Sequence, residues 1–264
     1  MQLSFDKYQG TGNDFILIDN RKKEIQLTTE QVAFLCDRRF GIGADGLMLL
    51  ELEPGVDFKM VYFNSDGRES SMCGNGGRCI TAFAKSLGLI NDKAKFVAID
   101  GVHEAVVSGI NNVSLKMNDV KSVESGDGFY YLNTGSPHYV KLVQGIKDYP
   151  VFEEGKRVRN SERFAAEGTN VNFIEPTEEG IFVRTYERGV ENETLSCGTG
   201  VTASALVAAM NGLCKERNNC KITTLGGKLN VKFDKVLESN FYNIWLEGPA
   251  EFVFHGSIKL DDQA

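Results

Sequence analysis

Two cysteines of this chain, Cys73 and Cys197, occupy the same place in two similar segments. The first segment reads CGNG at residues 73–76, and the second reads CGTG at residues 197–200, at an offset of 124 residues (197 minus 73). Each is followed by a helix-like run. A thiol at the first turn of a helix lies in the positive field of the helix N-terminus, which favours its thiolate form near neutral pH. The matched pair predicts two acid/base groups.

Such a pair of thiols could invert the configuration at a carbon atom that carries a carboxylate. The N–H groups of Gly74, Asn75, Gly198 and Thr199 could hold the carboxylate, which would place its neighbouring carbon between the two sulfurs. A thiolate on one side could remove the proton while a thiol on the other side delivers one. Both helix dipoles would stabilise the negative charge that develops. This chemistry needs no cofactor in principle, and we expect none, because the chain has neither a dinucleotide-binding motif nor a P-loop.

The similarity between the two halves extends beyond these turns. Residues 58–64 and 182–188 are both strand-like and carry a tyrosine at the same offset of 124, while residues 12–16 have a weaker counterpart at 135–139. Several separated segments therefore share one spacing, which predicts a duplicated domain. We expect a pseudo-twofold axis to bring both helix N-termini to one interface. Solenoids and propellers are excluded, because their repeats run to roughly 20 to 50 residues.

Short β-branched or alternating segments dominate the rest of the chain and predict strands. Two glycine-containing turns, at residues 100–101 and 226–227, predict hairpins. A capping pattern at residues 28–31 predicts a helix that Gly41 ends. The two helices after the cysteines are apolar around most of their circumference, which is expected of helices buried inside a wrapped sheet. The predicted fold class is α+β, with two pseudosymmetric duplicated domains, each a mostly antiparallel sheet or barrel around a central helix.

The predicted domains are 1–118, to which residues 249–264 return as a C-terminal strand, and 119–248. A chain of 264 residues is long enough for two such cores. Its 42% hydrophobic and 25% charged residues are ordinary for a globular protein. Residues 1–9 do not resemble a signal peptide and no stretch approaches the roughly 20 apolar residues of a membrane span, so we expect a cytoplasmic protein without a membrane partner.

Charge and cysteine usage exclude other classes. A net charge of -7 without a basic cluster argues against a nucleic-acid partner. Six cysteines are too few for a disulfide scaffold, and no compact Cys/His cluster supports a metal site, so we expect no metal. A glycine-rich turn alone often reflects tight packing or a phosphate site, and a buried cysteine is usually inert. We apply that interpretation to Cys36, Cys79, Cys214 and Cys220, which lack a matched partner.

Several motifs are spread in order over nearly the whole chain: GNDF at 12–15, GIGADG at 41–46, FNSDG at 63–67, MCGNGGRC at 72–79, GTNVNF at 168–173, YERG at 186–189 and CGTG at 197–200. Together they resemble the signatures of the diaminopimelate epimerase family. The resemblance implies a pyridoxal-independent isomerase with two pseudosymmetric domains. It also implies that the small-molecule substrate is LL-diaminopimelate, which the protein converts to the meso isomer for lysine and peptidoglycan synthesis. The resemblance further implies a homodimer.

The resemblance also implies a role for each matching residue. Cys73 and Cys197 would be the catalytic thiols. The carboxylate at the reacting centre would be bound by Gly74, Asn75, Gly198 and Thr199, with Asn13 close by. The distal amino and carboxylate groups would be recognised by Asn64, Asn170, Glu187 and Arg188. That division is chemically apt, because an arginine can fork onto a carboxylate while a glutamate accepts from an ammonium group.

Two positions near the glycine turn at 135 are accessory candidates. His138 could orient a thiol or the substrate, or could simply be packed in the core. Ser136 stands where many family members carry asparagine, and Gly46 stands where some carry glutamine. Both changes shorten the side chains expected near the reacting amino group.

Two alternative functions are also compatible with the sequence. Proline racemases and hydroxyproline epimerases resemble this chain in their two-cysteine mechanism, but a proline-type substrate has no second amino acid end for the distal residues to bind. A thiol–disulfide redox protein or a cysteine-based sensor would also use reactive thiols in proximity. Such a sensor would respond to oxidants without turning over an amino acid.

Overall fold

The computed structural model describes residues 1–70, 72–237 and 239–260 of the chain. The chain divides into two compact units: the first comprises Met1–Leu115 with Pro249–Ala264, and the second comprises Lys116–Gly248. The predicted first boundary, after residue 118, lies three residues beyond the boundary between these units. Residues 261–264 of the predicted return strand lie outside the described residues. The strand itself, β17, covers Glu251–Lys259.

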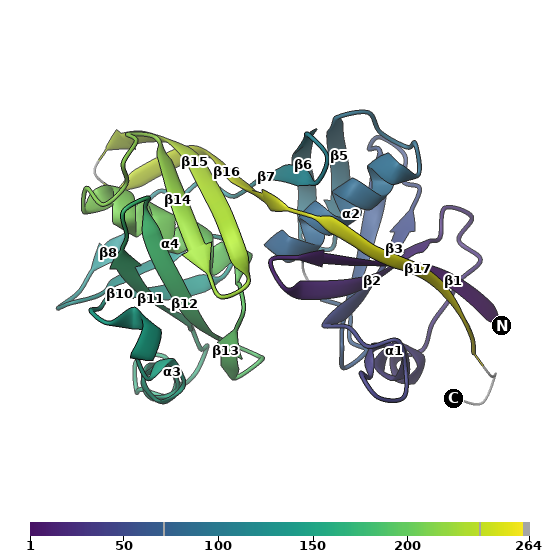
Figure 1. The fold of residues 1–264 in the computed structure, drawn as a ribbon, viewed down its shortest axis with the longest axis horizontal. Coiled ribbons are helices and arrows are strands. Elements are labelled where there is room, and N and C mark those ends of the chain that lie inside the picture. The colour runs from purple at the N-terminus through teal and green to yellow at the C-terminus, as the bar shows by residue number, and fades with distance from the viewer. Residues whose placement is uncertain (71, 238, 261–264) are drawn as a thin grey trace. The chain divides into compact units, whose positions relative to one another are not determined.

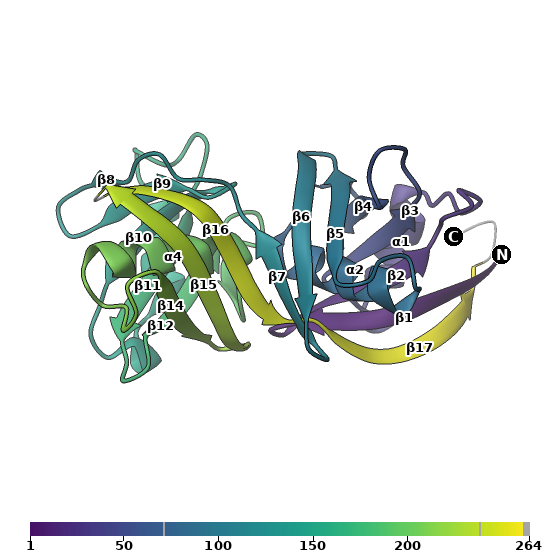
Figure 2. The ribbon, with the colours of Figure 1, turned by 90° about the horizontal axis from the view of Figure 1, so that it is seen from above.

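The first unit is built on one sheet that curves around helix α2 (Gly74–Ser86) (Figure 1). Neighbouring strands follow the order β17, β1, β2, β3, β4, β5, β6 and β7. Figure 2 shows β17 alongside β1. The strand bounds are Gln2–Gly10 for β1, Asn13–Asp19 for β2, Gly46–Glu51 for β3, Phe58–Asn64 for β4, Lys93–Ala98 for β5, Gly101–Ser108 for β6 and Asn112–Lys116 for β7.

The second unit repeats this arrangement around helix α4 (Gly198–Met210). Its strand order is β8, β9, β10, β11, β12, β14, β15 and β16, and the short β13 (Asn192–Thr194) also pairs with β12. The bounds are Glu124–Ser125 for β8, Tyr130–Asn133 for β9, Pro137–Leu142 for β10, Asn170–Pro176 for β11, Ile181–Glu187 for β12, Asn219–Thr224 for β14, Gly227–Leu237 for β15 and Asn240–Pro249 for β16.

The sequence of strand orientations is the same in both units. Along each strand order the pairs are antiparallel, antiparallel, parallel, antiparallel, parallel, antiparallel and antiparallel. Helices α2 and α4 are both 13 residues long and begin 124 residues apart (198 minus 74). Most of their residues are buried, as expected for helices enclosed by a sheet. The predicted α+β fold with duplicated domains is therefore confirmed.

A second helix packs on the other side of each sheet. Helix α1 (Thr29–Cys36) buries Val32 and Leu35 in a cluster with Ile16 and Leu47. Helix α3 (Val151–Arg159), which follows the 3-10 turn Ile146–Asp148, buries Val151 and Val158 in a cluster with residues of β11 and β12. Each unit thus has a central helix on the concave side of its sheet and a smaller helix outside it.

The predicted start of α1 is confirmed, but its predicted end is wrong. Thr28 and Gln31 form the expected capping box, with Thr28 Oγ1 accepting from the Gln31 N–H at 3.2 Å. The helix stops at Cys36 rather than at Gly41 because Asp37 Oδ1 accepts from the N–H groups of Arg39 and Phe40, both at 2.7 Å. This local turn competes with further helix hydrogen bonds.

Candidate active site

Each of the two matched cysteines is the N-cap residue directly before a central helix, as the sequence predicts. Cys73 Sγ accepts a hydrogen bond from the Gly76 N–H at 3.2 Å. The Cys197 side chain does not cap α4 in this way, and its sulfur lies 3.5 Å from Thr199 Oγ1. The two thiols therefore occupy equivalent backbone positions but have different polar neighbours.

A tight turn between β1 and β2 places Asn13 beside Cys73. Gly10 pairs with Asn13, so the turn consists of Thr11 and Gly12, both with positive φ angles of 50° and 82°. Two such residues form the turn type that matches the right-handed twist of a hairpin. Asn13 Oδ1 then accepts from Asn75 Nδ2 at 3.2 Å and lies 3.8 Å from Cys73 Sγ. The structure thus brings Asn13, Cys73 and Asn75 together.

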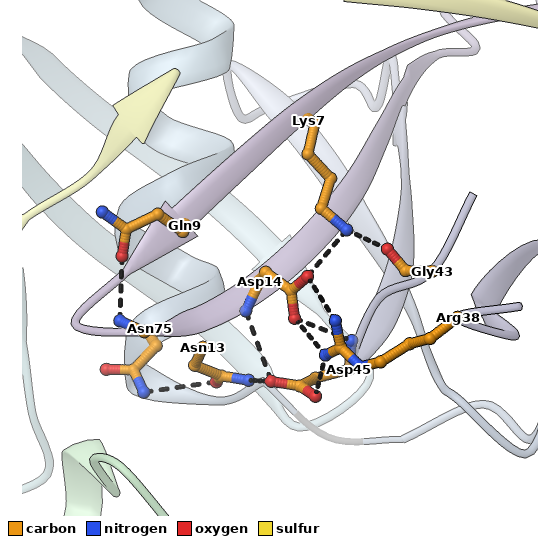
Figure 3. Close-up of polar contacts among 9 residues, drawn as sticks. Lys7, Gln9, Asn13, Asp14, Arg38, Gly43, Asp45 and Asn75 are labelled. Carbon is orange, nitrogen blue, oxygen red and sulfur yellow. Dashed lines mark hydrogen bonds and ion pairs between the residues drawn. The ribbon is translucent and has the colours of Figure 1, made fainter. Parts of the chain in front are cut away.

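A network of ion pairs supports Asn13 from the solvent side (Figure 3). Asn13 Nδ2 donates to Asp45 Oδ2 at 2.7 Å, and Arg38 bridges Asp45 and Asp14 at 2.7 and 2.6 Å. The buried Lys7 completes the network through Asp14 at 2.7 Å. Burial raises the pKa of Asp14, but hydrogen bonds from Arg38 and Lys7 outweigh it and hold the pKa below its usual value. The network therefore stays charged and keeps the β1–β2 turn in place.

Arg78 lies one turn inside α2 and is fully buried. Its Nη2 donates to Asn75 Oδ1 at 2.9 Å, its Nη1 to the Gly74 carbonyl at 3.2 Å, and its Nε to the Pro249 carbonyl at 3.3 Å. Burial lowers the pKa of Arg78 to about 10, so the guanidinium remains protonated at neutral pH. This residue lies inside the motif at 72–79, yet the sequence alone assigned it no role.

Three of the four predicted distal residues meet at one end of the second unit's sheet. Asn170 Oδ1 accepts from the Arg188 N–H at 2.9 Å. Arg188 Nη1 donates to the Glu167 carbonyl at 2.9 Å, and Thr194 Oγ1 donates to Glu187 Oε2 at 2.9 Å. The start of β11 supplies Asn170, the end of β12 supplies Glu187, and Arg188 follows directly after β12.

Asn64, the fourth predicted distal residue, belongs to the first unit. It is exposed at the end of β4 and opens a turn in which its carbonyl accepts from the Gly67 N–H at 2.9 Å. It pairs with Gly46, so the position at which some family members carry glutamine lies directly beside it on β3.

His138 is fully buried on β10, and the structure fixes its charge. Asn172 Nδ2, which can only donate, lies 3.1 Å from His138 Nδ1, so that ring nitrogen is an acceptor and the imidazole is neutral. Burial, aided by the positive charge of Arg188, lowers the pKa of His138 to about 3. Asn172 lies in the motif at 168–173, but sequence reasoning assigned it no role. Its Oδ1 also accepts from Thr185 Oγ1 at 2.9 Å.

The turn before His138 lies against the first turn of α4. Thr134 Oγ1 donates to the Thr199 carbonyl at 2.9 Å, and the Thr134 N–H donates to the Ser136 carbonyl at 3.2 Å. Ser136 is half-buried in this turn, between β9 and β10. This turn has the same place in the second unit as the β1–β2 turn, with Asn13, has in the first.

Over the described ranges, no helix is long and apolar enough to cross a membrane. Within the same ranges, no group of three or more His, Cys, Asp or Glu side chains is arranged to hold a metal ion. The polar residues that gather around Cys73 and Cys197 are instead mostly amides and hydroxyls, which suit the binding of a charged organic molecule.

Solved structures show which class of fold this is. A PhzF-family phenazine biosynthesis protein from Bacillus anthracis matches with a TM-score of 0.75 at 14% identity, over 98% of this chain and 100% of that one. A hydroxyproline epimerase from Agrobacterium vitis, solved with bound trans-4-hydroxy-L-proline, matches with a TM-score of 0.71 at 14% identity, over 99% of this chain and 94% of that one. The chain therefore has the two-domain fold that these proteins share.

Sequence comparison identifies the family within that fold. The family model for diaminopimelate epimerase matches residues 5–123 and 130–253. A diaminopimelate epimerase from Flavobacterium psychrophilum is 52% identical over 254 residues, which covers 96% of this chain and 98% of that protein. The chain belongs to the diaminopimelate epimerase family, and it is an isomerase.

Proposed function

We propose that this protein converts LL-2,6-diaminopimelate to meso-diaminopimelate, with Cys73 and Cys197 as the two acid/base groups. The observation that supports this proposal most directly is the matched pair of N-cap thiols, one before each central helix of a chain in this family. Helix N-termini attract anions, and a thiolate is the reactive form of cysteine. Two such positions provide both a base and an acid.

In the proposed reaction one sulfur starts as a thiolate and the other as a thiol. The thiolate removes the proton from the substrate's α-carbon, and the electron pair left behind is delocalised into the adjacent carboxylate. The thiol then delivers its proton to the opposite face of that carbon, which inverts the configuration. After one turnover the two sulfurs have exchanged their protonation states, so exchange with solvent must restore the starting form.

The groups around each thiol would stabilise the charge that forms during this step. N–H groups at the start of α2 and α4, on Gly74, Asn75, Gly198 and Thr199, would bind the carboxylate as its negative charge increases. Asn13 adds a carboxamide that is already held by Asn75 and Asp45. Preorganised donors of this kind need no rearrangement at the moment of reaction.

Specificity for a substrate with two amino acid ends would come from Asn64, Asn170, Glu187 and Arg188. The hydroxyproline epimerase shares the fold, so the fold alone does not separate the two activities. A proline-type substrate offers no second ammonium or carboxylate group for these residues. The contact between Asn170 and the Arg188 backbone supports their action as one set.

Family membership also supports a biological setting. We propose that the reaction serves lysine and peptidoglycan synthesis, that the protein works in the cytoplasm, and that it forms a homodimer. We expect no cofactor to take part, because the two thiols supply both proton transfers.

The test is to incubate the purified protein with LL-diaminopimelate, without pyridoxal phosphate or added metal, and to separate the stereoisomers by chiral chromatography. Formation of the meso isomer is the expected result. L-Proline and trans-4-hydroxy-L-proline serve as comparison substrates. Turnover of either at a rate equal to that of diaminopimelate, or a response to oxidants with no turnover at all, would contradict the proposal.

A further inference from the structure

Arg78 is a buried cation next to the Cys73 site, and its hydrogen-bond partners are uncharged. The guanidinium is fully buried and donates to two backbone carbonyls and to Asn75 Oδ1. In the part of the chain that the structure describes, no carboxylate forms an ion pair with it. Burying a charge is costly unless other groups compensate for it, so the position calls for a reason beyond packing.

The chemistry of Arg78 determines which way the neighbouring amides point. Arginine has no acceptor, so the oxygen of the Asn75 carboxamide must face it, and Asn75 Nδ2 must face the other way. That nitrogen donates to Asn13 Oδ1 at 3.2 Å. Asn13 Nδ2 then faces the carboxylate of Asp45, which can only accept. The three hydrogen bonds therefore form a chain in which Arg78 donates to Asn75, Asn75 donates to Asn13, and Asn13 donates to Asp45.

The second unit has neither the arginine nor the asparagine at the equivalent positions. Thr202 occupies the place of Arg78, and its Oγ1 donates to the Gly198 carbonyl at 2.9 Å, just as Arg78 Nη1 donates to the Gly74 carbonyl. Thr199 occupies the place of Asn75. The helix fold therefore does not require a cation at this position, because α4 forms with a threonine there.

We propose that Arg78 is a positioning residue: it holds the Asn75 carboxamide so that its N–H groups, rather than its oxygen, face Asn13 and the substrate carboxylate beside Cys73. The proposal rests on the proposed function. Without Arg78 the Asn75 amide could rotate and turn its oxygen toward the carboxylate, which would repel it. The buried positive charge also favours an anion at the N-terminus of α2.

A double-mutant cycle tests this role. Arg78→Met and Asn75→Ala are each expected to lower kcat/KM for LL-diaminopimelate about 100-fold. If Arg78 acts through Asn75, the double variant should be no more than about threefold worse than the poorer single variant. Arg78→Lys, which also only donates, should recover at least tenfold of the loss. Thr202→Val is the matched control in the second unit, and its kcat/KM should stay within twofold of wild type.

Several outcomes would overturn the proposal. Losses that multiply in the double variant would show that Arg78 acts independently of Asn75, and kcat/KM in Arg78→Met within threefold of wild type would show that it has no positioning role. If Arg78→Met does not fold, as judged by circular dichroism and urea unfolding, Arg78→Gln replaces it in the cycle. A wild-type protein without any activity on LL-diaminopimelate would instead refute the proposed function, which separates the two failures.

Discussion

At the scale of single residues, equivalent positions in the two units have acquired different chemistry. Cys73 has a carboxamide neighbour and a capping N–H, whereas Cys197 has the hydroxyl of Thr199. Arg78 is buried in α2, whereas the equivalent buried residue in α4 is Thr202. The duplicated fold supplies two similar sites, and these side chains make them unequal.

Each of the two thiols that we propose as acid/base groups should be essential. Cys73→Ser and Cys197→Ser are expected to lower kcat by at least about 1000-fold, because a hydroxyl is far too weak an acid to replace a thiolate base. Cys214→Ser is the control, since Cys214 is a half-buried thiol whose Sγ donates to the Ala205 carbonyl at 3.8 Å. Initial rates in both reaction directions measure the effect. Near-normal turnover in either serine variant would remove that cysteine from the mechanism.

Arg188 should matter for the distal end of the substrate. Arg188→Ala is expected to lower kcat/KM for diaminopimelate by well over tenfold, because it leaves a substrate charge without its partner. An exposed ion pair contributes only about 1 kcal/mol or less, so Arg157→Ala, which removes an exposed pair with Glu154, should leave the activity unchanged. Steady-state kinetics on both variants would decide, and equal values for Arg188→Ala and wild type would exclude the distal role.

His138 should make the protein less stable in mild acid. The pKa of His138 is about 3 in the folded chain, below the ordinary 6.5, so the unfolded state takes up a proton that the folded state does not. Stability contributed by neutral His138 is complete above pH 6.5 and is lost as pH falls toward 3. Between pH 7 and pH 5 the loss amounts to about 2 kcal/mol.

Urea unfolding at pH 7 and pH 5 measures this contribution. The free energy of unfolding should fall by about 2 kcal/mol less in His138→Gln than in wild type over that interval. A His103→Gln variant provides the comparison, because it also removes one histidine. The same pH dependence in wild type and His138→Gln would contradict the assignment of a buried neutral imidazole.

Sequence patterns could identify the cysteines but not the residues that position them. Cys73 and Cys197 were detectable because a repeated motif marks both. Lys7 and Arg38 lie outside every motif, and their importance depends on a carboxylate that the fold brings close. Arg78 and Asn172 lie inside motifs, but their roles follow from the direction of hydrogen bonds, which residue spacing does not encode.

At the scale of elements, local signals predicted turns and helix starts well. Both predicted hairpins formed, with Ala98 paired to Gly101 and Thr224 paired to Gly227. The end of α1 was mispredicted because the Asp37 side chain closes a turn that ends the helix at Cys36, before Gly41, the glycine expected to end it. Short polar side chains that bond to their own backbone compete with glycine as helix stops.

The first turn of α4 has no room for a side chain at Gly200. A Cβ atom there would overlap Asn172 Oδ1, which is buried and held by a hydrogen bond from Thr185. Gly200→Ala is therefore expected to lower the free energy of unfolding by about 1 to 3 kcal/mol. The reduction should exceed the small gain in helix propensity that alanine brings.

Ser204 in the same helix provides the matched control. Its buried hydroxyl has no hydrogen-bond partner among the described residues, so Ser204→Ala should be neutral or slightly stabilising. Urea unfolding of both variants at one pH measures the difference. Unfolding free energies that agree within error for Gly200→Ala and Ser204→Ala would show that Asn172 moves aside without cost.

At the scale of the whole molecule, the repeat is more complete in the structure than in the sequence. Both units share one order of strand orientations, but the first strand of that order is β17 in the first unit and β8 in the second. The pairing of β1 with β17 joins residues from opposite ends of the chain, such as Gln2 and Lys259. Local patterns do not specify such distant partners, whereas the repeat spacing could predict the duplication itself.

The two-base mechanism is the central claim, and the fate of the substrate proton in D2O tests it most directly. If one cysteine removes the proton and a different, solvent-equilibrated cysteine supplies the new one, the meso product should carry deuterium at the inverted carbon from the first turnovers. The remaining LL-diaminopimelate should carry little. Mass spectrometry of the separated isomers at less than one tenth conversion gives both values. Early product that is mostly unlabelled would contradict the account, because a single base would then be returning the original proton.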